Sequence, residues 1–128
     1  MKANELFIGA WVEYKGTHHK ILGIHKDDSG DYRGQIDDEF KQWYLLSEFK
    51  SIPITAEILE HNGFCKDGLP RYGLVIDKIP LFVFHYKDDV WKVICELDLT
   101  RPCVNRIRFV HELQMCLLLN RIDKEIAL

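Results

Sequence analysis

The hydrophobic pattern of the chain changes its period at residue 54, and this change restricts the fold more than any other feature. Residues 6–54 contain short runs in which apolar and polar side chains alternate, and turn-forming residues separate the runs. A period of two is typical of strands with one buried face. Beyond residue 54, apolar residues first recur at helical spacing and then return to strand-like runs. The sequence therefore predicts a compact α+β protein with a β-rich first part and a mixed second part.

The first part has room for five short strands. Ala10 and Val12 mark the buried face of the first strand, turn residues follow at Lys15-Gly16 and at residues 27–31, and further short runs extend to residue 54. Short strands joined by tight turns have to close on themselves to hide their edges. We therefore expect a small SH3-like β-barrel over residues 1–54.

The clearest local signal is a capped helix directly after the change of period. Thr55 can cap its N-terminus, and Ile54 and Leu59 have the spacing of a hydrophobic staple. Gly63 supplies the left-handed residue that ends many helices, and Phe64 can fold back on Leu59. These residues predict a helix over residues 56–62.

Strand-like sequence follows this helix and predicts an antiparallel meander with short turns. Three runs form it: residues 72–77, 81–86 and 90–97. In the middle run, Phe82, Phe84 and Tyr86 occupy alternate positions. Alternate positions of a strand share a face, so the pattern places three aromatic rings on one side of the meander.

A second helix is expected near the end of the chain. Asn105 has the features of an N-cap, and Val104 and Phe109 have staple spacing. Apolar residues then recur at three- and four-residue steps up to Leu119. Residues 55–128 are therefore expected to form an α+β subdomain of helix, three strands and helix. Because no linker-like composition separates the halves, this subdomain should be tightly joined to the first.

The charge balance and the apolar runs argue against two kinds of partner. The chain has 17 basic and 20 acidic residues and a net charge of -3, so no strong overall field draws it to nucleic acid or anionic lipid. The longest apolar runs, residues 79–84 and 115–119, are far shorter than the roughly 20 residues of a membrane-spanning helix. We expect no membrane partner, and a nucleic-acid role would need a local basic patch.

The cysteines and histidines show no recognisable reaction centre. The four cysteines contain no CxxC pair, and the first residues do not have the pattern of an export signal, so reduced thiols in a cytoplasm are expected. The six histidines lack the spacing for joint metal ligation, and no motif of nucleophilic catalysis is present. The sequence predicts no enzyme, no metal and no cofactor, and a thiol or metal enzyme is the weakest interpretation.

Three segments resemble a known family. They are Ile8-Gly9-Ala10-Trp11-Val12, residues 52–59 with Asn62-Gly63-Phe64, and Val110-His111-Glu112-Leu113-Gln114. In these segments the chain resembles small uncharacterised proteins of Bacteroides-type gut bacteria and their prophages or mobile elements. The resemblance implies a cytoplasmic protein of mobile-element type, and it implies no activity, cofactor or catalytic residue.

One local feature favours nucleic-acid binding. Residues 101–111 contain Arg101, Arg106 and Arg108 and no acidic residue, and Lys92 lies in the strand-like run before them. Three arginines would neutralise only about two or three phosphates, so weak, salt-sensitive contact is expected. The alternative is that the arginines pair with acidic residues of the chain itself.

The aromatic content favours a protein-binding role. The chain has 3 Trp, 5 Tyr and 7 Phe, which exceeds what two small cores need if some rings lie outside. The alternative is that these rings fill the core. The candidate interaction residues are Trp11, Trp43, Tyr44 and Tyr86. The first functional expectation is a non-enzymatic adaptor module that binds a protein partner or a second copy of itself, and nucleic-acid binding is the second.

Overall fold

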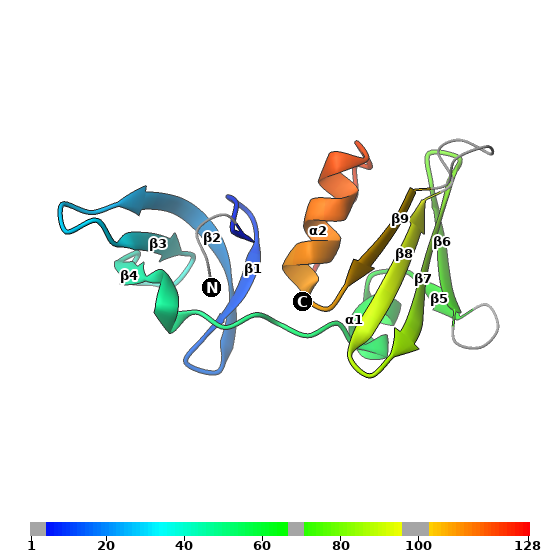
Figure 1. Cartoon of the computed structure of the whole chain (residues 1–128), viewed down its shortest axis with the longest axis horizontal. Helices are drawn as coiled ribbons and strands as arrows, with labels where there is room; N and C mark the ends of the chain where they lie inside the picture. The colour runs from blue at the N-terminus through cyan, green and yellow to red at the C-terminus, as the bar shows by residue number, and fades with distance from the viewer. Residues whose placement is uncertain (1–4, 67–70, 96–102) are drawn as a thin grey trace. The chain divides into compact units, whose positions relative to one another are not determined.

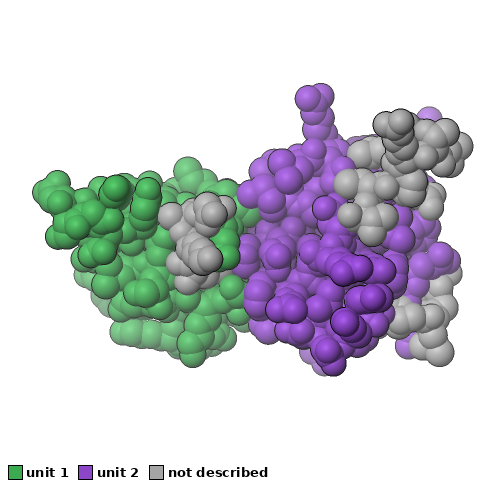
Figure 2. Space-filling model, viewed as in Figure 1, with its two compact units in different colours: residues 1–52 green, residues 53–128 purple. Residues whose placement is uncertain are grey.

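The chain forms two compact units, Met1–Ile52 and Pro53–Leu128 (Figures 1 and 2). A computed structural model describes residues 5–66, 71–95 and 103–128. Both units are built on antiparallel sheets, and the second also carries two α-helices. The predicted α+β class is confirmed. No helix of the described segments has the length and apolar character needed to cross a membrane.

The first unit contains a four-stranded antiparallel sheet in the order β1-β2-β3-β4. Its strands are β1 (Trp11–Tyr14), β2 (Thr17–Lys26), β3 (Tyr32–Ile36) and β4 (Trp43–Leu45), and the 3-10 helix η2 (Leu46–Glu48) follows. Lys15 and Gly16 both have positive φ and connect β1 to β2 as a two-residue hairpin turn. Such turns match the twist of the strands they join.

The strands of the first unit do not form a closed barrel over the described residues 5–52. The predicted fifth strand over residues 49–54 is present only as an isolated bridge, in which Glu13 and Lys50 exchange two backbone hydrogen bonds of 2.9 Å. The ladder cannot continue far, because Pro53 has no N–H to donate. Pro53 instead forms a bridge with Phe109 inside the second unit.

Small residues and large side chains fit closely in the core of the first unit. A Cβ atom added to Gly34 would lie 2.8 Å from the ring of Phe49 and 3.2 Å from Leu46. Position 34 therefore has no room for a side chain. The buried residues of this core are Leu6, Ala10, Val12, Ile21, Ile36, Leu46 and Phe49.

The second unit contains a five-stranded antiparallel sheet between two helices in sequence. Its elements are α1 (Ala56–His61), β5 (Cys65–Lys66), β6 (Arg71–Ile76), β7 (Ile79–Lys87), β8 (Val90–Cys95), β9 (Cys103–Ile107) and α2 (Val110–Leu119). The sheet order is β5-β6-β7-β8-β9. The predicted three-stranded meander is present as β6 to β8, and the structure adds a strand at each edge.

The predicted capping of the first helix is confirmed. The Thr55 hydroxyl accepts a hydrogen bond from the Ile58 amide at 3.2 Å, Gly63 has φ +87°, and the Phe64 amide donates to the Leu59 carbonyl at 3.0 Å. These interactions are local in sequence. Their residues could therefore be recognised before the fold was known.

The predicted N-cap at Asn105 is wrong. Asn105 lies in β9, where it pairs with Val93 of β8, and α2 begins only at Val110. The helix terminus is held instead by Glu112, whose Oε1 accepts hydrogen bonds from the backbone amides of Arg108 (3.0 Å) and Phe109 (3.1 Å). Strand pairing with β8 outweighs the local capping preference of Asn105.

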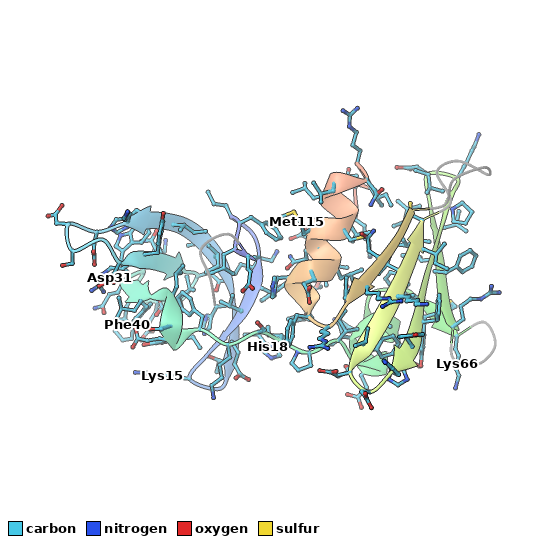
Figure 3. All side chains as sticks on the ribbon, viewed as in Figure 1. Lys15, His18, Asp31, Phe40, Lys66 and Met115 are labelled. Atoms are coloured by element: carbon cyan, nitrogen blue, oxygen red, sulfur yellow. The ribbon has the colours of Figure 1, made fainter. Side chains whose placement is uncertain are left out.

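Buried and partly exposed residues alternate along β7 and β8, which gives the second sheet a buried face and an open face. Figure 1 shows α2 against one face of this sheet. The buried side chains of that layer are Leu81, Val83, Trp91, Val93 and Ile107 of the sheet and Val110, Leu113 and Leu117 of α2. The residues between them point to the opposite face, from which side chains project away from α2 (Figure 3).

Candidate nucleic-acid interface on the open face of the second sheet

Three aromatic rings lie along the open face of β7. Leu81 and Val83 are buried, whereas the alternate residues Phe82 and Phe84 are partly exposed and the side chain of Tyr86 is 42% exposed. The predicted placement of these rings on one face is therefore confirmed. A register irregularity between His85 and Lys87 leaves Tyr86 opposite no residue of β8. Such bulges commonly redirect a side chain at the end of a strand.

Basic side chains from three neighbouring strands flank these rings. The strand register aligns Phe84 of β7 with Arg71 of β6 on one side and with Lys92 of β8 on the other, and Lys92 is paired in turn with Arg106 of β9. The guanidinium of Arg71 lies 4.6 Å from the ring centre of Phe82, and Lys92 Nζ lies 5.9 Å from that of Phe84. The row therefore combines aromatic and cationic groups on one surface.

Tyr86 is the point where the cations converge. Lys92 Nζ lies 4.0 Å from its ring centre, the Arg106 guanidinium carbon 5.2 Å, and Lys87 Nζ 5.7 Å. A cation within about 6 Å of an aromatic face is attracted by the charge distribution of the ring. The ring thus holds positive groups from three strands in one place.

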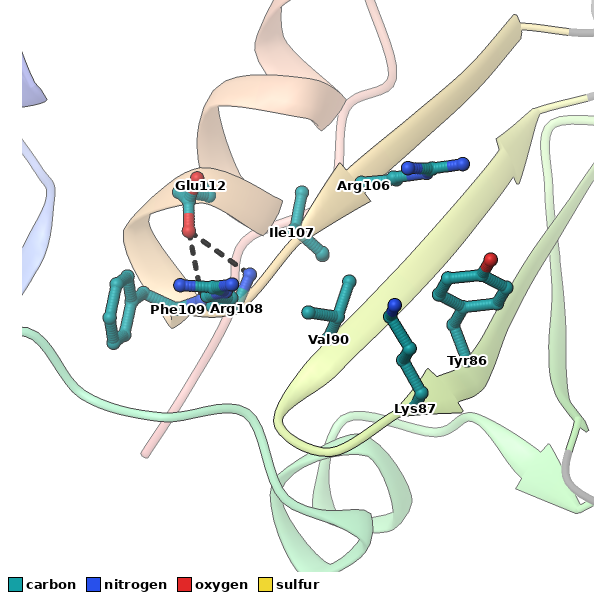
Figure 4. A pocket seen from close by; sticks show the side chains of 8 residues that line it. All are labelled: Tyr86, Lys87, Val90, Arg106, Ile107, Arg108, Phe109 and Glu112. Atoms are coloured by element: carbon teal, nitrogen blue, oxygen red, sulfur yellow. Dashed lines mark hydrogen bonds between the residues drawn. The ribbon is translucent and has the colours of Figure 1, made fainter.

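An open pocket of about 430 Å³ adjoins Tyr86 (Figure 4). Lys87, Arg106 and Arg108 bring three positive charges to its wall, and Val90 and Ile107 add apolar surface. Glu112 also lines the pocket, with its Oε1 bound to the two backbone amides at the start of α2. Arg108 Nε lies 3.8 Å from Asp89 Oδ1, and both side chains are largely exposed. Exposed pairs of this kind are weak, so Arg108 can turn to another anion.

The structure brings some of the predicted interaction residues together and separates others. Tyr86, Lys92, Arg106 and Arg108 lie around the same end of the sheet. Arg101 lies outside the described residues. The sequence did not single out Lys87, although its place beside Tyr86 at the end of a strand-like run was a usable signal.

The aromatic candidates of the first unit belong to other environments. Trp43 is 40% exposed and lies on the sheet over Gly23, and the ring centre of His25 is 4.3 Å from that of Trp43. Trp11 is partly buried, with Lys20 Nζ 5.2 Å from its ring centre. Trp43 is thus an exposed ring of this unit that packs on its sheet.

Tyr44 points to the face opposite Trp43 and contributes to the core. Its ring centre lies 4.4 Å from that of Tyr14 and 6.4 Å from that of Phe49. The Tyr44 hydroxyl donates a hydrogen bond to Asp38 Oδ2 at 2.7 Å, and this bond and the removal of water raise the pKa of Tyr44 to about 12. These contacts give Tyr44 a structural role, and its interaction role stays a prediction.

The described residues hold no group of three His, Cys, Asp or Glu side chains arranged to bind a metal ion. Cys95 and Cys116 are buried thiols, and Cys65 is an exposed thiol. The side chain of Cys103 lies outside the described part of the structure.

Comparison with known proteins does not identify the chain. No protein-family model, no curated protein and no solved structure matches it.

Proposed function

We propose that the second unit binds single-stranded nucleic acid on the open face of its sheet. The observation that carries the proposal is Tyr86, an exposed ring with cationic groups of three strands 4.0 to 5.7 Å from its centre. Single-stranded nucleic acid offers bases that stack on rings and phosphates that pair with cations. Among the described side chains of the rows through Phe82, Phe84 and Tyr86, none is acidic.

The energies favour exchange of a bound cation for a base. A cation–ring contact at an exposed site is worth about 0.5–1 kcal/mol. Stacking of a base on an aromatic ring is worth about 1–3 kcal/mol by alanine substitution. A base that displaces one of the three cations from the Tyr86 ring therefore gains at least what that contact loses, and the displaced Lys92 or Arg106 can pair with the phosphate that the base brings. The proposed binding couples these two gains.

The shape of the surface favours single strands over duplexes. Phe82 and Phe84 are partly buried in the face of the sheet, so a base must lie flat against the strands to reach them. Bases in a duplex are stacked and paired and expose only their edges in the grooves. Bases of a single strand can turn outward and stack on such rings. We expect RNA and DNA single strands to bind and duplexes to bind less tightly.

Fluorescence anisotropy with a labelled single-stranded oligonucleotide tests the proposal. Tyr86→Ala should weaken binding at low salt by about tenfold, the loss expected for one stacked base. Tyr32→Ala is the matched control, because Tyr32 of the first unit is 45% exposed and has Lys26 Nζ 5.7 Å from its ring centre. No binding by the wild-type protein, or equal losses in the two variants, would contradict the proposal.

A protein-binding role of the first unit is the second candidate function. Tryptophan is enriched among the residues that contribute most to protein interfaces, and the exposed Trp43 lies over Gly23 and beside His25. An SH3-like architecture and a cytoplasmic adaptor of mobile-element type remain part of this second proposal. The Glu13–Lys50 bridge directly after η2 supports the SH3-like architecture alone. Pull-down with wild-type protein and Trp43→Ala tests the protein-binding role, and capture that does not change in the variant would argue against it.

A further inference from the structure

We infer that the pocket beside Tyr86 holds the terminal phosphate of the bound strand, so that the protein prefers phosphorylated ends. This inference rests on the proposed nucleic-acid function. It depends on the order of charges along β7 and the hairpin that follows. The aromatic column runs from Phe82 through Phe84 to Tyr86, and the pocket with Lys87, Arg106 and Arg108 lies where this column ends.

Acidic groups lie at the pocket and beside it: Glu112 lines the pocket, and Asp89 of the neighbouring turn contacts Arg108. The turn from β7 to β8 consists of Asp88 and Asp89, and the Asp89 side chain is 65% exposed. Asp88 has φ +50° and its carbonyl accepts a hydrogen bond from His85 Nε2, which holds the turn in place. A strand that continued past the pocket would bring its next phosphates toward these carboxylates. The charge pattern therefore favours a strand that ends at the pocket.

A terminal phosphate suits the pocket better than an internal one. A phosphate monoester carries close to two negative charges at neutral pH and presents three acceptor oxygens, whereas each phosphate inside a strand carries a single charge. Arg108 is held at 3.8 Å by the exposed carboxylate of Asp89, so a dianion can compete for it. Lys87 and Arg106 reach the same pocket from β7 and β9.

Four oligothymidylates of about ten nucleotides test the inference, a length within the range that one binding surface covers. The first has hydroxyls at both ends, the second a 5′-phosphate, the third a 3′-phosphate, and the fourth is one nucleotide longer with hydroxyl ends. One of the two phosphorylated strands should bind about tenfold tighter than the first, the effect of one charge-assisted contact. The fourth strand controls for added charge and should not show this gain.

Variants separate the pocket from the rest of the surface. Lys87→Ala/Arg108→Ala should abolish the preference for the phosphorylated end, whereas Arg71→Ala, on the opposite edge of the aromatic column, should keep it. Asp88→Asn, which leaves the Asp89–Arg108 pair in place, should reduce the preference by improving binding of the hydroxyl-ended strand. Equal binding of all four strands, or a preference that survives the double alanine variant, would overturn the inference and leave the proposed function intact. Failure of every strand to bind would instead overturn the proposed function.

Discussion

The side-chain amide of Asn62 forms a pair of hydrogen bonds with the backbone of Ala127, 65 residues later in the chain. Nδ2 donates to the Ala127 carbonyl at 2.8 Å, and the Ala127 amide donates to Oδ1 at 2.7 Å. Nδ2 also donates to the Ile58 carbonyl of α1 at 2.8 Å. Asn62 is 4% exposed, whereas Ala127 is exposed, so the asparagine side of these bonds is the one that lies away from water. Asn62 thus fixes the last residues of the chain to the end of α1.

Asn62→Ala should destabilise the second unit by about 1–3 kcal/mol, because the variant loses the three hydrogen bonds of a side chain that lies away from water. Native-state amide exchange in α1 measures this loss within the unit. Asn120→Ala is the matched control, since the Asn120 amide donates to the carbonyl of Cys116 within its own helix end and holds no distant segment. Exchange in α1 as slow in Asn62→Ala as in wild type would show that the chain end does not stabilise the helix.

Gly34→Ala should destabilise the first unit by about 1–3 kcal/mol through overpacking. The added Cβ would lie 2.8 Å from the ring of Phe49, which is 2% exposed and cannot move aside. Gly23→Ala offers a contrast, since its Cβ would meet the partly exposed Trp43 at 2.9 Å and that ring can swing outward. Urea unfolding in a Trp91→Phe background, where Trp11 and Trp43 report on the first unit, measures both. A larger loss in Gly23→Ala than in Gly34→Ala would contradict this packing argument.

Tyr44 should ionise about two pH units later than an ordinary tyrosine, because the pKa of Tyr44 is raised to about 12 by its hydrogen bond to Asp38. Since the folded pKa lies above the unfolded value of 10.0, the bond stabilises the folded state fully below pH 10. This contribution is lost as the pH rises through 12. Ultraviolet titration of phenolate absorption in wild type and Tyr44→Phe measures the late component. If the tyrosine that is missing from the Tyr44→Phe curve ionises near pH 10 in the wild-type protein, the prediction is refuted.

The features that the sequence predicts correctly are those that depend on neighbouring residues. The cap of α1 depends on Thr55 and Gly63, and the aromatic face of β7 depends only on alternate spacing of Phe82, Phe84 and Tyr86. Each pattern lies within a single helix or strand and its adjoining residues. Their interpretation does not require the partner strands.

The features that the sequence could not predict depend on pairing between distant segments. Lys92 and Arg106 meet Tyr86 only because β8 pairs with β7 and β9 joins the sheet beside β8. Asn105 satisfies the local rules for a cap, but its strand pairing with Val93 provides backbone hydrogen bonds that a frayed helix start would lack. The local preference is smaller than this tertiary contribution. The candidate site could therefore be anticipated by residue type and not by its geometry.

Binding to single-stranded nucleic acid should weaken with salt, with a slope of log K against log salt of about -2, if Lys87, Lys92 and Arg106 each neutralise one phosphate. Arg106→Ala should make this slope shallower by about 0.7 and weaken binding to all sequences alike, because a phosphate contact carries no base preference. Arg33→Ala is the control, since Arg33 of the first unit pairs with Asp27 at 2.9 Å. Anisotropy titrations at several salt concentrations give the slopes. If the slope of log K against log salt stays the same in Arg106→Ala, this guanidinium does not contact a phosphate. Stacking on the rings of β7 would then have to account for its share of the affinity.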